Sequence, residues 1–336
     1  MADLVAAPDS AEGPTAAPGA FARQMDALMP DPEGRPGRYR AVVDDRWNCP
    51  IVPQGGVMAA LAARAIADEV GDPGQALRTL TTVFASAVPA GPVTVDVQVL
   101  RRGRSVTQAL ATVRPDGADG ADDAHDPGTH SDSDGGHATL AVFGRTRPGF
   151  AFTDQRRPDV PGPDESPSFG DGYEPPDGEE PFEVPYWDQV EGRPCLGHAP
   201  WDDWVPERSD CAYWYRFAEP PRRPDGTLDP LALVALCDSM PGSVSERLGP
   251  NDQRSWWAPS ADLTVHVLGE SRSEWVLAHL RAHRAGEGYA SGELALWDPE
   301  AGLVAFATQV MIFTFPEPLP PELLVPVDQR PVTPPA

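Results

Sequence analysis

The feature that most constrains the fold is a weak internal repeat, in which each half of the chain has one long apolar helix followed by a run of strands. The two helices are predicted over 55–70 and 229–244, and one predicted strand precedes each of them. The predicted strands are 38–47, 78–86, 93–103, 105–114 and 137–145 in the first half, and 211–219, 261–269, 274–286, 288–297 and 302–315 in the second. An apolar helix must be covered by protein on most sides, so each half is predicted to be α+β, with its helix wrapped by an antiparallel sheet.

Shifts in composition outside the repeat predict the domain organisation. Residues 1–20 are rich in alanine, proline and aspartate and are predicted to be disordered. The N-terminal domain is predicted over 21–146, with an acidic loop at 115–137 that contains seven aspartates and does not fit the ligand spacing of an EF-hand. A proline-rich and acidic linker that packs against a surface is expected over 147–210. The C-terminal domain is expected over 211–316, and a proline-rich tail over 317–336.

Composition excludes several classes of function. The net charge of −25 argues against binding of nucleic acid or of an anionic membrane through a basic surface. All 26 basic residues are arginine, which excludes a Schiff-base lysine and a phosphate-loop lysine. The chain shows no signal-peptide pattern and no apolar run long enough to span a membrane, so a cytoplasmic location is expected. Its four cysteines lack metal-ligand spacing, so reduced thiols and no metal site are expected.

One acidic residue lies in the apolar second helix. Asp229 and Pro230 form a favourable helix start, and Pro241 with Gly242 predicts its end. At helical spacing, Asp238 shares a stripe with leucine, valine and alanine side chains. A buried carboxylate without partners costs several kcal/mol, so Asp238 is expected either to be catalytic or to be held by nearby backbone N–H groups.

Six stretches, in this order and spacing, resemble the double-hotdog acyl-CoA thioesterases of the thioesterase II type, in particular their actinobacterial relatives. They are PQGGVMAALAARA (53–65), VPAGPVTVDVQVLRRGRSV (88–106), DPLALVALCDSMP (229–241), SADLTVHVL (260–268), EWVLAHLRAHRAGEGYASGELALWD (274–298) and LVAFATQ (303–309). The resemblance covers roughly residues 38–145 and 211–315. It implies a tandem hotdog fold and hydrolysis of an acyl-CoA thioester.

The resemblance also implies which residues hold the attacking water. In this family an aspartate on the second helix, a threonine or serine at the start of the next strand and a glutamine on the last strand share one water. Asp238, Ser260 and Gln309 match these positions, with a serine that keeps the hydroxyl group. The strand pattern independently places Gln309 on a face of small and apolar residues, where it is either in a pocket or a hydrogen-bonded core amide.

Four further residues are candidates for binding the substrate. Gly55 and Gly56 open the first helix, where free N–H groups favour an oxyanion or a phosphate, although a tight strand-to-helix turn would also explain them. Met311 shares the strand face of Gln309 and is expected in the acyl pocket. His266 is the rival general base, because alternation places it on the side of Ser260.

The favoured function is therefore hydrolysis of an acyl thioester to free acid and CoA, with an acyl-CoA substrate and no cofactor other than the CoA within it. The first helix carries no acid between Gly56 and Ala67, so only the second half could supply the carboxylate. A non-catalytic acyl-CoA-binding protein is the alternative. A hotdog enoyl-CoA hydratase would need a catalytic histidine that WNCPIVPQGG (47–56) lacks. The resemblance also suggests a homo-oligomer formed through the sheets, and the arginines of 101–104 are candidates for holding CoA.

Overall fold

The computed structural model describes residues 19–117, 135–169, 171, 183–199, 202–249 and 256–315. The expectations for the N-terminal segment before residue 19, for most of the acidic loop and for the C-terminal tail therefore lie outside the described residues.

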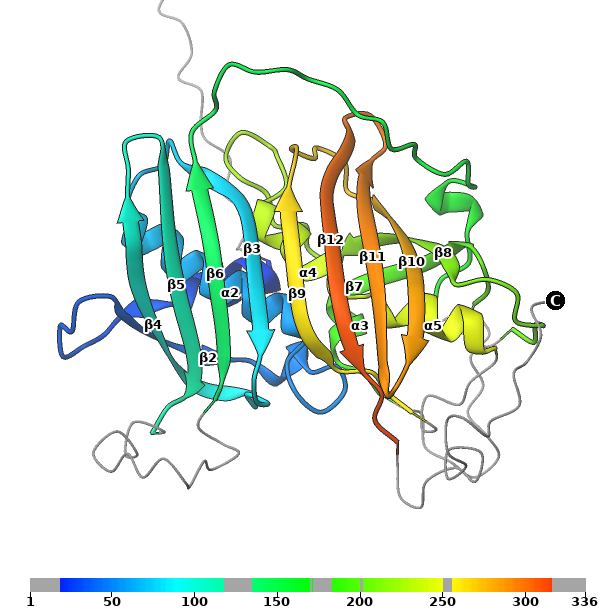
Figure 1. Ribbon diagram of the computed structural model, residues 1–336, viewed down its shortest axis with the longest axis horizontal. Helices are drawn as coiled ribbons and strands as arrows, with labels where there is room; N and C mark the ends of the chain where they lie inside the picture. The colour runs from blue at the N-terminus through cyan, green and yellow to red at the C-terminus, as the bar shows by residue number, and fades with distance from the viewer. Residues whose placement is uncertain are drawn as a thin grey trace, which may run out of the picture.

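Twelve strands form one antiparallel sheet, with the main helices behind it in the view of Figure 1. The strands are β1 (Met29–Pro30), β2 (Arg38–Val43), β3 (Ala76–Phe84), β4 (Gly91–Arg102), β5 (Val106–Pro115), β6 (His137–Gly144), β7 (Val190–Leu196), β8 (Asp210–Phe217), β9 (Ser260–Val267), β10 (Val276–Gly286), β11 (Tyr289–Asp298) and β12 (Gly302–Ile312). Their order across the sheet is β1-β2-β4-β5-β6-β3-β9-β12-β11-β10-β8-β7.

The internal repeat is confirmed by this order. The two halves meet where β3 pairs with β9, and outward from this pair the strands follow in the same sequence on both sides: β6, β5, β4 and β2 on one side, β12, β11, β10 and β8 on the other. Even the irregularities repeat, because β4 has a register shift between Val99 and Arg101 and β10 has one between Ala282 and Arg284. Each half is therefore a hotdog-like unit, and the sheet is continuous across both.

The first helix has the predicted bounds. α2 (Gly55–Val70) begins where the Gln54 side chain accepts a hydrogen bond from the Val57 N–H, and it ends at Gly71, whose φ of 63° is left-handed. Its face toward the sheet and its neighbours is built largely from fully buried alanines. Such small side chains allow α2 to pack closely against the helix of the other half.

The prediction of a single long helix over 229–244 is wrong. The structure has two shorter helices, α4 (Pro230–Leu236) and α5 (Pro241–Leu248), and residues 237–240 lie between them. Pro241 explains the interruption, because its ring would collide with the carbonyl four residues earlier in a continuous helix. Pro241 thus ends α4, as expected, but it also starts α5. Asp238 lies in the break and not on a helix.

The segment expected to be a linker over 147–210 contributes to the sheet. It contains a 3₁₀ turn (Pro163–Glu165), helix α3 (Tyr186–Gln189) and strand β7, which pairs with β8. Between β6 and the 3₁₀ turn, the chain crosses the upper end of the sheet from the first half to the second (Figure 1). β7 was missed because it is a short edge strand interrupted by Pro194, which an edge tolerates.

Two short elements complete the described chain. Helix α1 (Ala20–Asp26) and the 3₁₀ turn Asp45–Trp47 pack beside α2, where Phe21 and Trp47 are fully buried. No helix among the described residues is long and apolar enough to cross a membrane.

Candidate active site

The three residues predicted to hold the water lie together at the junction of the two halves. The Ser260 hydroxyl, at the start of β9, donates a hydrogen bond of 2.8 Å to Oδ1 of Asp238. The Gln309 side-chain amide, near the end of β12, donates to the same Oδ1 and also to the Ser260 hydroxyl. Asp238 comes from the break after α4, so three separate elements converge on one carboxylate oxygen.

A β-bulge brings Ser260 into this group. On β12, Val310 pairs with Asp262 and Met311 pairs with Ser260, so Ala261 is an extra residue on β9. An extra residue reverses the side to which the preceding side chain points. Ser260 therefore faces the buried side, together with Gln309 and Met311.

The bulge also explains why His266 is not in the group. Simple alternation assigns His266 to the side of Ser260, but that alternation is broken at Ala261. His266 is exposed on the outer side of the sheet, opposite to the side of the buried Leu263 and Val265. The structure thus separates His266 from Asp238 by the thickness of the sheet.

The second carboxylate oxygen of Asp238 is held by the first turn of α2. The Gly56 N–H donates a hydrogen bond of 2.9 Å to Oδ2. A Cβ at Gly55 would lie 2.8 Å from this oxygen, and a Cβ at Gly56 would lie 2.7 Å from the Ala235 carbonyl oxygen. Glycine is therefore needed at both positions for the helix start to approach the carboxylate. In the structure these glycines contact Asp238. Their role in binding substrate stays a prediction.

Gln54 is a residue of the site that sequence reasoning missed. Its side-chain amide donates hydrogen bonds of 2.9 Å to the carbonyl oxygens of Ala235 and Asp238. The same side chain caps α2, so one buried residue fixes the helix start of the first half to the α4–α5 break of the second half. The available signal was its place immediately before the glycine pair, where a capping side chain is expected.

The electrostatic environment of Asp238 contains opposing contributions. Burial raises the pKa of the carboxyl above its usual value, because desolvation disfavours the charged form. Hydrogen bonds from Ser260, Gln309 and the backbone of the two glycines act in the other direction. The result is a carboxylate that is held by four donors and still has a raised pKa, as a general base requires.

Two other side chains complete the inner side of the site. Met311 is fully buried beside Gln309. Gln309 is 2% exposed, and its Oε1 has no hydrogen-bond partner. Buried polar atoms are normally paired, so this oxygen is an acceptor available to a ligand or water.

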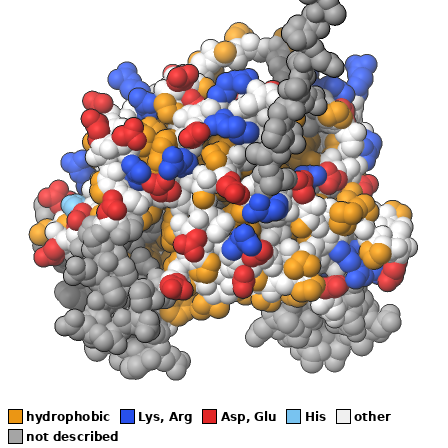
Figure 2. All heavy atoms as spheres, turned by 180° about the vertical axis from the view of Figure 1, so that it is seen from behind, with side chains coloured by type: hydrophobic (Ala, Val, Ile, Leu, Met, Phe, Trp, Pro, Cys, Tyr) orange, Lys and Arg blue, Asp and Glu red, His pale blue; other side chains and the backbone are white. Residues whose placement is uncertain are grey.

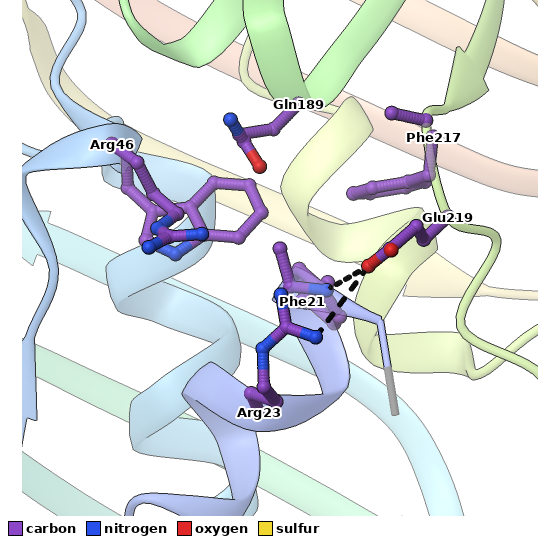
Figure 3. Close-up of a pocket in the computed structure, with 9 residues that line it drawn as sticks. Phe21, Arg23, Arg46, Gln189, Phe217 and Glu219 are labelled. Carbon is purple, nitrogen blue, oxygen red and sulfur yellow. Dashed lines mark hydrogen bonds and ion pairs between the residues drawn. The ribbon is translucent and has the colours of Figure 1, made fainter. Parts of the chain in front are cut away.

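A cavity of about 240 Å³ lies elsewhere and shares no residue with the Asp238 group. Figure 3 shows it between α1 and the end of β8, with the Arg23–Glu219 ion pair at its edge. The arginines of 101–104 are also remote, because Arg102 donates to the carbonyls of Glu69 and Val70 at the far end of α2. Figure 2 shows basic and acidic side chains interspersed on the face opposite to that of Figure 1. The described residues contain no group of three or more metal-ligating side chains.

Comparison with known families identifies the family of the chain. The model of the acyl-CoA thioesterase N-terminal domain matches residues 43–124, and that of the C-terminal domain matches residues 154–313. Together they cover well over half of the chain. The chain belongs to the acyl-CoA thioesterase family. It is thus an acyl-CoA thioesterase, as the sequence predicted, and acyl-CoA is its class of substrate. No curated protein sequence matches the chain.

Solved structures confirm the tandem hotdog fold of this thioesterase. A hot dog fold protein from Alicyclobacillus acidocaldarius is 24% identical, with a TM-score of 0.69, over 88% of this chain and 98% of the other. The acyl-CoA thioesterase II TesB2 from Mycobacterium marinum is 19% identical, with a TM-score of 0.63, over 89% and 99%. The tesB protein of Mycobacterium avium subspecies paratuberculosis is 14% identical, with a TM-score of 0.62, over 88% and 98%.

Proposed function

We propose that the thioesterase hydrolyses its acyl-CoA substrate with one water that is held and activated by Asp238, Ser260 and Gln309. The observation that carries this proposal is the convergence of the Ser260 hydroxyl and the Gln309 amide on a single oxygen of Asp238. The Gly56 N–H at the helix start donates to the other carboxylate oxygen, Oδ2. Two side chains from distant strands add to this backbone donor.

In this mechanism Asp238 acts as the general base. Its carboxylate takes one proton from the water while the water oxygen attacks the thioester carbonyl carbon. The tetrahedral intermediate collapses by breaking the C–S bond, and the sulfur of CoA takes the proton back from Asp238. The products are the free acid and CoA with its thiol, and no cofactor is required beyond the CoA of the substrate.

Ser260 and Gln309 have positioning roles in this proposal. The Ser260 hydroxyl and the Gln309 amide fix the Asp238 carboxylate, and the unpaired Gln309 Oε1 accepts a hydrogen bond from the water. The Gly56 N–H orients the carboxylate from the other side. The proposed substrate contacts are Gly55, which lies beside the carboxylate, and Met311, which follows Gln309 on the buried side of β12. His266 has no place in this arrangement. A cytoplasmic location and a homo-oligomer stay predictions.

The decisive experiment replaces Asp238 by asparagine. Asparagine keeps the shape of the side chain and removes the base, so release of free CoA from acyl-CoA should fall by about 10³-fold or more. The thermal unfolding temperature should fall only modestly, because the asparagine nitrogen cannot accept the hydrogen bonds of one carboxylate oxygen but the other oxygen is kept. His266→Ala is the matched control on the outer side of the sheet and should keep full activity. A normal rate for Asp238→Asn would make the carboxylate structural and end the proposal.

A further inference from the structure

Next to the proposed active site, the buried side of the first half carries polar side chains that the proposed mechanism does not use. Thr82 and Thr139 face each other on β3 and β6, are fully buried, and have hydroxyl oxygens 2.8 Å apart. His137 lies two residues before Thr139 on β6 and is 5% exposed. Its ring stands edge-to-face against Phe84 of β3, with centroids 4.9 Å apart.

The nitrogens of His137 are not equivalent. Nδ1 is buried without a hydrogen-bond partner. The backbone of Ser86 is a hydrogen-bond partner of the ring and favours its protonated form, whereas burial acts more strongly and lowers the pKa of His137 to about 4. The ring is therefore neutral at pH 7. The unpaired Nδ1 is an acceptor in one neutral tautomer and an N–H donor in the other.

The internal repeat shows that these polar side chains are not demanded by the fold. Strand register identifies the equivalent position of each residue in the second half, because β3 corresponds to β9 and β6 to β12. Where the first half has Thr82, Phe84, His137 and Thr139, the second half has Val265, Val267, Ala305 and Ala307. All four replacements are aliphatic, so the same fold is built without any polar group there.

The polar group lies beside the proposed catalytic residues. β3 is the neighbour of β9, and β6 is the next strand, so His137 is about 10 Å from the strand of Ser260 at the usual spacing of about 4.8 Å. Phe84 lies between them: a Cβ on Gly55 would be 2.8 Å from the Phe84 ring and 2.8 Å from the Asp238 carboxylate. An acyl chain that leaves the thioester along Phe84 would therefore reach His137 next.

We propose that His137, Thr82 and Thr139 form a subsite for a hydroxyl group on the acyl chain, remote from the thioester, so that the enzyme prefers hydroxylated acyl-CoA over the unsubstituted chain. This inference rests on the proposed function. The buried Nδ1 has no hydrogen-bond partner within the protein, and a hydroxyl group, which can donate or accept, supplies one in either tautomer. A buried polar atom that is left unpaired by a plain alkyl chain disfavours that chain.

The test uses the Asp238→Asn variant of the full chain, so that binding is measured without turnover. Calorimetric titration would compare unsubstituted acyl-CoA with chains of equal length that carry one hydroxyl at successive carbons. One hydroxyl position should bind about tenfold tighter than the plain chain, the worth of a good buried hydrogen bond. Adding His137→Leu should abolish this difference, and adding His266→Leu, on the exposed side of the same sheet, should preserve it.

The other outcomes overturn the subsite. Equal weakening of plain and hydroxylated chains by His137→Leu would assign Nδ1 to the pantetheine arm, which both ligands share. Unchanged binding of both would mean that an internal water satisfies the ring. His137→Gln, which keeps an acceptor and has a different shape, gives a second variant if the leucine variant unfolds. Absence of CoA release by the wild-type enzyme would refute the proposed function alone, because the binding comparison does not depend on turnover.

Discussion

The two halves of the thioesterase share one register but differ at the three positions of the site. In both halves a bulge lies on the central strand, between Leu77 and Thr79 in β3 and between Ser260 and Asp262 in β9. The equivalents of the site follow from this register and from the two helix starts. They are Ala63 for Asp238, Leu77 for Ser260 and Ala141 for Gln309, and all three are buried and apolar.

The main helices of the two halves also differ, in length and in the residues at their starts. α2 runs for 16 residues without interruption, whereas α4 ends after 7 and leaves Asp238 in the break. At the helix starts, Gly55 and Gly56 of the first half stand where the second half has Pro230 and Leu231. The first half thus supplies backbone donors and the second half supplies side chains. Two similar units with this division of roles thus form a single site at their junction.

The largest expected effect comes from making the first half resemble the second. Ala63→Asp would bury a carboxylate on α2 among apolar residues with none of the partners of Asp238. An uncompensated buried charge costs about 3–5 kcal/mol, so the free energy of unfolding should fall by that amount and no second activity should appear. Denaturant unfolding measures it. Ala67→Asp, on the same helix but partly exposed, is the control and should cost much less. Equal losses would show that burial at Ala63 is not the cause.

The converse change removes the site from the second half. Gln309→Ala installs the residue that the first half has at this position, and CoA release should fall by about 10²–10³-fold because the water and Asp238 lose a polar partner. The thermal unfolding temperature should fall only modestly, because Ser260 and the start of α2 still donate to Asp238. Thr308→Ala, the exposed neighbour on β12, should leave the rate unchanged. Retained activity in Gln309→Ala would remove the amide from the mechanism.

The same comparison shows which parts of the structure were accessible from the sequence. The repeat, the bounds of α2 and the inward side of Gln309 follow from periodicity, because a helix or strand with one buried face must repeat its apolar residues. The side of the sheet to which Ser260 points does not follow from periodicity. The bulge at Ala261 interrupts the alternation, and the local composition gives no sign of it. The break between α4 and α5 was misread because the proline that ends one helix also starts the next.

An intermediate effect is expected where the halves touch. Gly56→Ala would place a Cβ 2.7 Å from the Ala235 carbonyl oxygen and 2.9 Å from the Asp238 Cβ. The helix start must then move away from the carboxylate, so stability should fall by about 1–3 kcal/mol, as for overpacking, and CoA release should fall with it. Calorimetry and initial rates together measure both. Gly71→Ala, at the other end of α2, would be strained by its positive φ and should lower stability without a specific loss in rate. A rate loss equal to that of Gly56→Ala would refute the specific role of the helix start.

The smallest expected effect is a shift in the pH dependence of the rate. Asp238 must be deprotonated to accept a proton, so the rate falls as the pH drops through its pKa, which burial raises above the ordinary value for aspartate. The Ser260 hydroxyl opposes this rise by donating to the carboxylate. Its removal in Ser260→Ala should therefore move the acid limb of kcat/KM to higher pH, in addition to lowering the rate. Thr264 also lies on β9, but its hydroxyl is on the opposite side of the sheet, 3.0 Å from that of Thr81 on β3. Thr264→Ala should therefore leave the acid limb in place. A limb that stays fixed or moves to lower pH in Ser260→Ala would show that the limb does not report the titration of Asp238.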